Sequence, residues 1–197
     1  NHLYFLIGDV SGKGVPASLF MAITRSLFRT LSQHVLSPAK IVTEMNNSIS
    51  DNNESNMFVT LIVGILDLET GILKLCNAGH NPPILIYPDG QVSYLEFKTQ
   101  IFVGVVEDFK YSDEEVVLEK ESKLFLYTDG VTEAENINKE LYGEEKLLEM
   151  LSDNASSDVR TTVNVVVDSI ASHVKEAEAS DDLTILLIQY EPGTANS

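Results

Sequence analysis

Three apolar, strand-like runs of this sequence have aspartates at one end, namely Asp9, Asp129 and the adjacent pair Asp181 and Asp182. Carboxylates that the fold brings together repel one another at neutral pH unless a cation neutralises them. All-oxygen ligation suits Mg²⁺ or Mn²⁺ better than Zn²⁺. The pattern therefore predicts a divalent-metal site built from these aspartates. The alternative for any one of them is a solvated turn or a helix cap.

Other metal or nucleophile chemistry has little support. The four histidines show no short paired spacing: His2, His34, His80 and His173. Cys76 is the one cysteine, so zinc sites, iron–sulfur sites and an internal disulfide are disfavoured. No arginine follows Cys76 at the spacing of a tyrosine phosphatase, and we expect this thiol to be buried in a strand.

A glycine-rich segment, GDVSGKG at residues 8–14, precedes an expected helix and resembles a phosphate-cradling loop. Gly14 stands where a nucleotide P-loop needs Ser or Thr, which argues against nucleotide binding. Lys13 either attracts a phosphate group or is a solvated charge. Divalent ions between Asp9 and an incoming phosphate would offset their repulsion, so the segment indicates metal-assisted hydrolysis of a phosphoester.

The elements that position these residues follow from apolar periodicity. Strands are predicted at 3–7, 57–66, 72–78, 83–87, 92–95, 116–118, 124–128 and 183–190, with Gly8 and Asp9 in a tight turn. Helices are predicted from Pro16, from Pro38 with Ser37 as N-cap, and at 143–151 and 159–174. The first helix should bury one face: Leu19, Phe20, Ile23, Leu27, Phe28 and Leu31. Paired helices between runs of antiparallel strands indicate an α+β fold with segregated layers.

Length and charge narrow the class of protein. The 197 residues favour one domain, with residues 1–190 as the domain and 191–197 as a flexible tail. The 13 basic and 30 acidic residues give a net charge of −17, which would repel nucleic acid. No apolar run approaches the ~20 residues that span a bilayer. We expect a cytoplasmic domain whose first residues read as a strand cut from a longer protein.

Four segments together resemble one family. They are GDVSGKGVPA at 8–17, NAGHNPP at 77–83, YTDGVTEA at 127–134 and SDDLT at 180–184. In this order they are similar to the bacterial SpoIIE-like branch of the metal-dependent, PPM-type serine/threonine protein phosphatases. The resemblance implies a four-layer α/β/β/α sandwich of two antiparallel sheets flanked by helices.

The resemblance also implies a ligand set. Asp9 would bridge two Mn²⁺ or Mg²⁺ ions, the carbonyl of Val10 would reach one of them, and Asp129 and Asp181 would complete the other. Asp182 replaces an Asn found in many relatives, and either ligates or acts from outside the ligand shell. A metal-activated water would be the nucleophile. Ser11 stands where eukaryotic relatives place a histidine proton donor, so no general acid is assigned.

Two departures from the family pattern matter. The upstream Gly-Gly-Asp-type segment, which supplies an acidic ligand, is missing, and this predicts weak occupancy of one metal position and low activity. His80 stands where some relatives carry a ligand for a third ion, so we expect it to shape a turn instead. The polar segment 133–143 is either a flap for a protein substrate or a surface connection.

The resemblance thus implies an enzyme that removes phosphate from serine or threonine of a partner protein. The expected partner is a phosphorylated anti-sigma-factor antagonist in bacterial signalling, and an amino-terminal regulatory domain is expected in the parent chain. The alternative is a catalytically weak or inactive module that uses the same fold for binding or as a scaffold.

Overall fold

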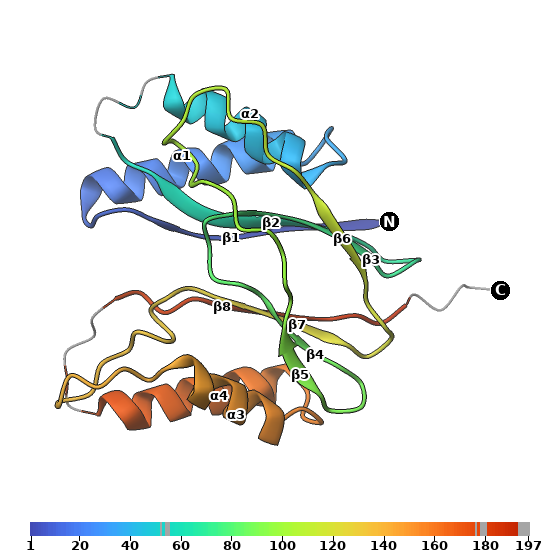
Figure 1. The fold of residues 1–197 in the computed structure, drawn as a ribbon, viewed down its shortest axis with the longest axis vertical. Helices are drawn as coiled ribbons and strands as arrows, with labels where there is room; N and C mark the ends of the chain where they lie inside the picture. Colours follow the sequence, from blue (N-terminus) through green and yellow to red (C-terminus); the bar gives the residue numbers. More distant parts are fainter. Residues whose placement is uncertain (52, 54–55, 176, 178–180, 193–197) are drawn as a thin grey trace. The chain divides into compact units, whose positions relative to one another are not determined.

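The computed structural model describes residues 1–51, 53, 56–175, 177 and 181–192. The chain divides into two compact units, each an antiparallel sheet with two helices on it (Figure 1). Unit 1 contains Asn1–His80, Phe97–Leu118 and, among the last described residues, Pro192. Unit 2 contains Asn81–Glu96 and Glu119–Glu191. Each unit is therefore assembled from separate stretches of sequence.

The sheet of unit 1 has the strand order β1-β2-β3-β6. Its strands are β1 His2–Val10, β2 Val59–Asp67, β3 Ile72–Ala78 and β6 Glu114–Val117. The predicted hairpin of β2 and β3 is confirmed. Its turn is closed by Asp67, whose carboxylate accepts hydrogen bonds from the backbone N–H groups of Glu69 (2.8 Å) and Thr70 (3.2 Å).

Strand β1 continues through the two residues that were predicted to form a turn. Gly8 and Asp9 pair with Leu61 and Thr60 of β2, and the turn begins only at Ser11. A Cβ atom at Gly8 would lie 2.7 Å from the Thr60 carbonyl oxygen, so this position of the strand requires glycine. The prediction of a turn here was wrong because the glycine serves close packing between strands rather than a reversal.

Two helices lie on one face of this sheet: α1 Val15–Leu31 and α2 Pro38–Ser50 (Figure 1). The predicted cap of α2 is confirmed, since the Ser37 hydroxyl accepts a hydrogen bond from Lys40 N–H at 3.2 Å. The same hydroxyl donates to the Asp113 carboxylate at 2.7 Å, which also accepts from Ala39 N–H. The predicted inner face of α2 is buried: Ile41, Val42, Met45 and Ile49.

The inner face predicted for helix α1 is confirmed at four of its six residues and wrong at Leu19 and Ile23. Leu19 and Ile23 are 61% and 54% exposed, whereas Thr24 is fully buried. The partly buried side chains that pack on the core of unit 1 are Ala17, Phe20, Met21, Leu27, Phe28 and Leu31. The inner face is therefore centred on Thr24, whose hydroxyl donates to the Phe20 carbonyl oxygen at 2.9 Å. The polarity of this threonine concealed the centre of the face from a hydropathy pattern.

The sheet of unit 2 has the order β5-β4-β7-β8. Its elements are β4 Ile84–Ile86, β5 Val92–Tyr94, β7 Lys123–Tyr127, β8 Ile185–Gln189, α3 Glu144–Asp153 and α4 Val159–Val174. All were predicted, with bounds that differ by a few residues at most. Lys123 is buried in β7 because its ammonium group donates to the carbonyl oxygens of Ala155 and Ser157, at 2.6 Å each.

The two antiparallel sheets and four helices confirm the predicted α+β class. Among the described residues, no helix is both long enough and apolar enough to cross a membrane. Most of the predicted tail, residues 193–197, and Ser180 of the last motif lie outside the described residues.

Candidate metal centre

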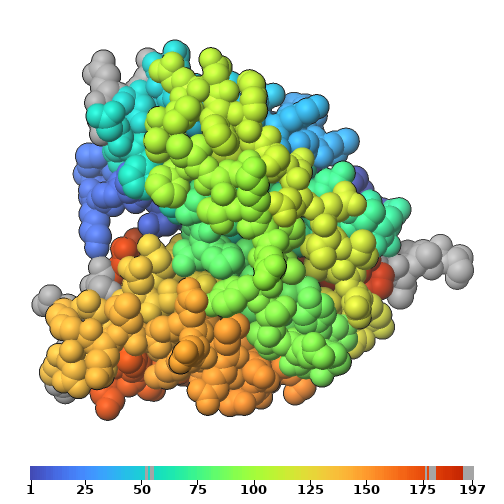
Figure 2. Space-filling model, in the orientation of Figure 1, coloured from blue at the N-terminus to red at the C-terminus, as the bar shows by residue number. Residues whose placement is uncertain are grey.

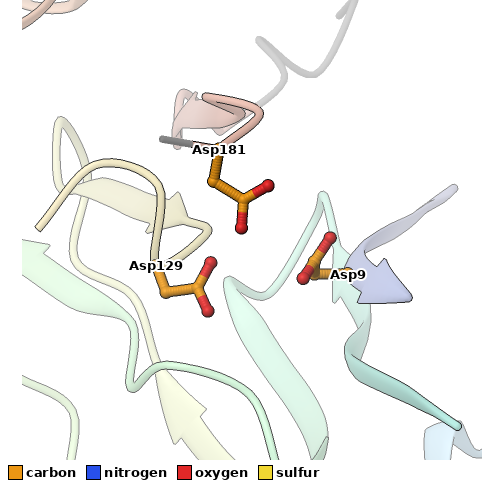
Figure 3. A group of neighbouring side chains, drawn as sticks. All are labelled: Asp9, Asp129 and Asp181. Atoms are coloured by element: carbon orange, nitrogen blue, oxygen red, sulfur yellow. The ribbon is translucent and has the colours of Figure 1, made fainter. Parts of the chain in front are cut away.

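In unit 1, the end of β1 presents Asp9 and leads into the loop 11–14 (Figure 3). Ser11 fixes the start of this loop, since its N–H donates to the Phe58 carbonyl and its hydroxyl accepts from Phe58 N–H, both at 2.9 Å. Gly12 and Gly14 have φ angles of 85° and 79°. Nothing lies near a Cβ at either position, so glycine is required here by conformation and not by space. Lys13 is exposed between them.

His80 is built into a turn of the same unit. Its backbone N–H donates to the Asn77 side-chain oxygen at 2.8 Å, and the Asn77 side-chain nitrogen donates to the His80 carbonyl at 3.0 Å. The Nδ1 atom of His80 lies 3.0 Å from the Thr60 hydroxyl. Thr60 is in turn the strand partner of Asp9. These contacts agree with the expectation that His80 shapes a turn.

In unit 2, the loops after β7 and before β8 are joined through Thr128. The N–H of Thr128 donates to the Thr184 carbonyl at 3.1 Å, and its hydroxyl accepts from Thr184 N–H at 3.1 Å. The same hydroxyl donates to the Asp182 carbonyl at 3.3 Å. Thr128 is buried, so these hydrogen bonds are shielded from water. They hold the two aspartate-bearing loops side by side.

Gly130 permits this approach of the two loops. A Cβ atom at position 130 would lie 2.3 Å from the Asp182 carbonyl oxygen, much closer than any real contact. The obstacle would be backbone, which cannot rotate away as a side chain can. The Asp-Gly pair at 129–130 is thus explained by close packing of two backbone segments.

The result is a pair of carboxylates. Asp129 and Asp181 offer oxygens within 4.8 Å of one another, and Figure 3 shows the two groups turned toward each other. Within the described part of the chain, the Oδ1 atom of Asp129 is buried and has no hydrogen-bond partner. A buried carboxylate oxygen without a partner is costly, and a divalent cation is a partner that satisfies it. This pair therefore fits a hard, oxygen-binding cation.

Asp182 contributes its backbone rather than its carboxylate to this arrangement. Its N–H donates to the Asp181 carboxylate at 2.9 Å, and its carbonyl accepts from Thr128. The Asp182 carboxylate does not belong to the pair formed by the Asp129 and Asp181 carboxylates. Asp9 belongs to unit 1.

Two positioning residues, Thr128 and Gly130, were not singled out from sequence. Both lie inside the quoted segment YTDGVTEA, so the signal was present in the motif. Their roles depend on contacts with the segment 182–184, which is more than 50 residues away in sequence. A sequence rule that considers only neighbouring residues could not assign these roles.

The segment 133–143 forms an ordered excursion beside Asp129. The N–H of Tyr142 donates to Ala134 at 2.9 Å, and the N–H of Gly143 donates to Thr132 at 2.9 Å. At its tip, the Asn136 side-chain nitrogen donates to the Glu140 carboxylate at 2.7 Å. Ile137 is 75% exposed there. The segment is thus a self-contained hairpin-like loop with an apolar tip.

The sequence was compared with protein-family models and with curated proteins. The family model described as "Stage II sporulation protein E (SpoIIE)" matches residues 1–191. The phosphoserine phosphatase RsbU of Bacillus subtilis (strain 168) is 26% identical over 184 residues, which cover 93% of this chain and 54% of RsbU. The chain spans 34% to 54% of the length of three curated relatives that it matches.

Solved structures share the fold. The RsbU and RsbW domains of Rv1364c from Mycobacterium tuberculosis superpose with a TM-score of 0.81 at 24% identity, over 98% of this chain and 53% of that chain. The catalytic domain of the serine threonine protein phosphatase PstP, crystallised in complex with two manganese ions, has a TM-score of 0.69 at 13% identity. That superposition covers 93% of this chain and 86% of PstP.

Proposed function

Because the chain belongs to the SpoIIE family, we propose that it is the catalytic part of a metal-dependent phosphatase that acts on serine or threonine phosphate of a partner protein. Residues 1–190 would act together as this domain. The observation that carries the proposal is the pair of carboxylates at Asp129 and Asp181, with the partnerless, buried Oδ1 of Asp129.

The residues of the pair fit the chemistry of phosphoester hydrolysis. A bound divalent ion would supply Lewis acidity toward the phosphoryl oxygens and would lower the pKa of water. The role of Asp129 and Asp181 is to hold that charge at a defined place, and Thr128 and Gly130 keep their loops in register. The similarity to a phosphatase solved with two manganese ions supports Mn²⁺ as the first ion to test.

We further propose the remaining members of the site from the family motifs. Asp9 would bridge two Mn²⁺ or Mg²⁺ ions and the carbonyl of Val10 would reach one of them. Asp182 would act from outside the ligand shell, which is supported by the use of its backbone to orient Asp181 and Thr128. Lys13, exposed between two glycines, would attract the phosphate group.

The parent protein's biology is proposed from the relatives. One of them, RsbU, is named a phosphoserine phosphatase, which supports a phosphoserine protein as the substrate. We propose a phosphorylated anti-sigma-factor antagonist as that substrate, an amino-terminal regulatory domain in the parent chain, and a cytoplasmic location.

The test is hydrolysis of p-nitrophenyl phosphate and of a phosphoserine peptide, with saturating Mn²⁺ and with EDTA. We expect Mn²⁺-dependent turnover that Asp129→Ala and Asp181→Ala each reduce by about a hundredfold or more, as loss of a ligand that holds catalytic charge should. Asp182→Ala should reduce turnover less than Asp129→Ala or Asp181→Ala does.

The matched control is Asp153→Ala, which removes one exposed carboxylate from α3 of the same unit. It should leave turnover unchanged. Equal and negligible rates for the original chain, the aspartate variants and the EDTA sample would contradict the catalytic proposal. They would favour the alternative, a binding or scaffold module that keeps the fold.

A further inference from the structure

The segment 133–143 of unit 2, which we call the tip loop, presents two aliphatic side chains to solvent. Ile137 is 75% exposed and Leu141 is 54% exposed. Figure 2 shows this part of the chain, in gold, at the surface. Single exposed aliphatic residues are common on proteins, but these two share one short loop that follows Asp129 directly in sequence. Their position next to the carboxylate pair distinguishes them from other exposed aliphatic residues.

The root of the tip loop is hydrogen-bonded to the backbone of Asp129. The N–H of Glu133 donates to the Asp129 carbonyl at 2.7 Å, and the Thr132 hydroxyl donates to the same oxygen at 3.4 Å. Ile137 is three residues beyond Ala134, a stretch of chain that spans at most about 11 Å. An extended substrate covers the same distance in three or four residues. A phosphoserine held at the carboxylate pair would therefore have such neighbours within reach of the tip loop.

The tip loop is stabilised by its own hydrogen bonds and by contact with α4. The Asn136 side-chain oxygen accepts hydrogen bonds from the N–H groups of Asn138 (2.9 Å) and Glu140 (3.1 Å). The Tyr142 hydroxyl donates to the Ser169 hydroxyl of α4 at 2.9 Å. A surface that is already ordered loses little conformational entropy when a partner binds to it. The tip loop is thus pre-organised for contact.

The charged residues of the tip loop are mainly acidic. The loop contains three glutamates, Glu133, Glu135 and Glu140, and one lysine, Lys139, whose ammonium group lies 2.7 Å from the Glu135 carboxylate. Glu133 and Glu140 are exposed. Their negative charge repels a phosphate group and attracts a basic residue. The loop therefore favours a substrate that places its phosphate at the metal centre and a basic residue at the loop.

We propose that the tip loop selects the protein substrate. Ile137 and Leu141 contact an apolar side chain three or four residues from the phosphoserine, and Glu133 favours a basic residue beside it. Because this role concerns substrate preference, it rests on the proposed phosphatase function. p-Nitrophenyl phosphate is too small to reach the tip loop from the metal centre, so the preference applies to peptide and protein substrates.

Charge decides between this occupant and two others. A second copy of the chain, paired symmetrically through the tip loop, would place the same glutamates opposite one another, which is electrostatically unfavourable. A bilayer that contains anionic lipid would repel these glutamates as well. A substrate segment with one apolar and one basic residue complements both the aliphatic side chains and the acidic charge of the loop.

The experiment compares two fluorescently labelled phosphoserine peptides in saturating Mn²⁺. The first peptide has leucine and lysine at the third and fourth positions on both sides of the phosphoserine, and the second has alanine and glutamate there. We expect the KM of the original chain to be lower for the leucine–lysine peptide by about tenfold or more. Glu133→Gln should raise this KM, while Glu145→Gln, at an exposed residue of α3, should not.

A second set of variants tests the apolar part. Ile137→Ser/Leu141→Ser should raise the KM for the leucine–lysine peptide to that for the alanine–glutamate peptide, and should affect p-nitrophenyl phosphate far less. Ile137→Leu should retain the preference, because it keeps an aliphatic side chain at the tip. Val117→Ser, at a residue 61% exposed on β6, is the control and should change neither KM. Thermal unfolding of each variant checks that it folds.

Failure of this role can be distinguished from failure of the phosphatase function. If p-nitrophenyl phosphate is not hydrolysed, the phosphatase function fails, and fluorescence anisotropy of the same peptides still measures whether the tip loop binds the leucine–lysine sequence. Equal KM values and equal affinities for the two peptides on the original chain would overturn the role of the tip loop. An equal loss of p-nitrophenyl phosphate and peptide turnover in Ile137→Ser/Leu141→Ser would overturn it too, since the loop would then support the metal centre instead.

Two further results would contradict a substrate as the occupant. The first is self-association in sedimentation that Ile137→Ser/Leu141→Ser abolishes. The second is binding of phosphatidylcholine–phosphatidylglycerol vesicles that requires Ile137, without preference between the two peptides.

Discussion

At the scale of single residues, several glycines of this chain are required by the close approach of a neighbouring backbone segment or side chain. Gly130 faces the Asp182 carbonyl, and Gly8 faces that of Thr60. Gly64 lies beneath the ring of Phe5, its partner across β1 and β2, where a Cβ would be 2.1 Å from the ring. In each case the missing side chain is what allows a neighbouring group to occupy its place.

We predict that Gly130→Ala lowers Mn²⁺ affinity and destabilises the fold by about 1–3 kcal/mol, because the added methyl group displaces the loop that carries Asp181. Calorimetric titration with Mn²⁺ and denaturant unfolding measure the two effects. Gly90→Ala is the control, since Gly90 has a φ of 88° in the hairpin of β4 and β5. It should cost stability through backbone strain while leaving Mn²⁺ affinity unchanged. If Gly130→Ala and Gly90→Ala lose the same Mn²⁺ affinity, the proposed role of Gly130 is refuted.

Cys76 supplies another prediction at this scale. Burial, and secondarily the negative charge of Asp113, raise the pKa of the Cys76 thiol to about 12. The thiol is fully buried in β3 and lies 3.8 Å from the Gln100 side-chain nitrogen. We expect a thiol reagent to modify the native protein at least about a hundredfold more slowly than the unfolded protein. Rapid modification without unfolding would show that the thiol is accessible.

At the scale of elements, side-chain caps fix the starts of α2 and α4, whereas α1 and α3 begin after a glycine without such a cap. Ser37 caps α2 and is held by Asp113, while Asp158 caps α4 by accepting hydrogen bonds from Thr161 N–H (3.1 Å) and the Thr161 hydroxyl (2.6 Å). Helix α1 differs, because Gly14 precedes it without a side-chain cap and Pro16 occupies its first turn. Its start is set by the glycine loop rather than by a capping hydroxyl.

The Asp158 cap predicts a pH dependence of stability. Hydrogen bonds from the Thr161 side chain and then its backbone hold the pKa of Asp158 below its ordinary value of 3.8. A depressed pKa stabilises the folded state above the unfolded-state pKa, and this contribution is lost as the pH falls through the folded-state pKa. The stability difference between the original chain and Asp158→Asn should therefore shrink as the pH falls below 3.8. Denaturant unfolding at several pH values measures this difference. A stability difference that does not change with pH would contradict a lowered pKa of Asp158 in the folded state.

At the scale of the whole molecule, negative charge dominates. The net charge of −17 opposes the compact state through self-repulsion, which any added salt screens. A specific metal site would add a separate contribution, because a ligand that binds only the folded state raises its stability by mass action.

These two effects can be separated by thermal unfolding. Mn²⁺ should raise the Tm of the original chain beyond the rise caused by NaCl of equal ionic strength, and EDTA should reverse the difference. At a concentration about a hundred times Kd, the gain would be ~2.7 kcal/mol. Asp129→Asn should show only the ionic-strength effect. If Mn²⁺ and NaCl act alike on the original chain, the carboxylate pair binds no metal under these conditions.

The class of fold and most elements could be predicted from sequence because they depend on neighbouring residues. The cap of α2 follows from Ser37 and Pro38, and α4 follows from apolar periodicity over 159–174 with the predicted bounds. The hairpin of β2 and β3 follows from two β-forming runs around a polar turn. The aspartates were identified in the same way, since each stands at the end of an apolar run.

Only the tertiary structure decided which surfaces are covered and which loops meet. The sequence by itself determined that α1 is an amphipathic helix, but its inner face is centred on Thr24 and leaves Leu19 and Ile23 exposed. Likewise, the sequence identified Asp129 and Asp181, but their pairing depends on the contacts of Thr128 and Gly130 with the segment 182–184. Propensity and periodicity act over a few residues, whereas burial and close approach depend on segments that only folding brings together.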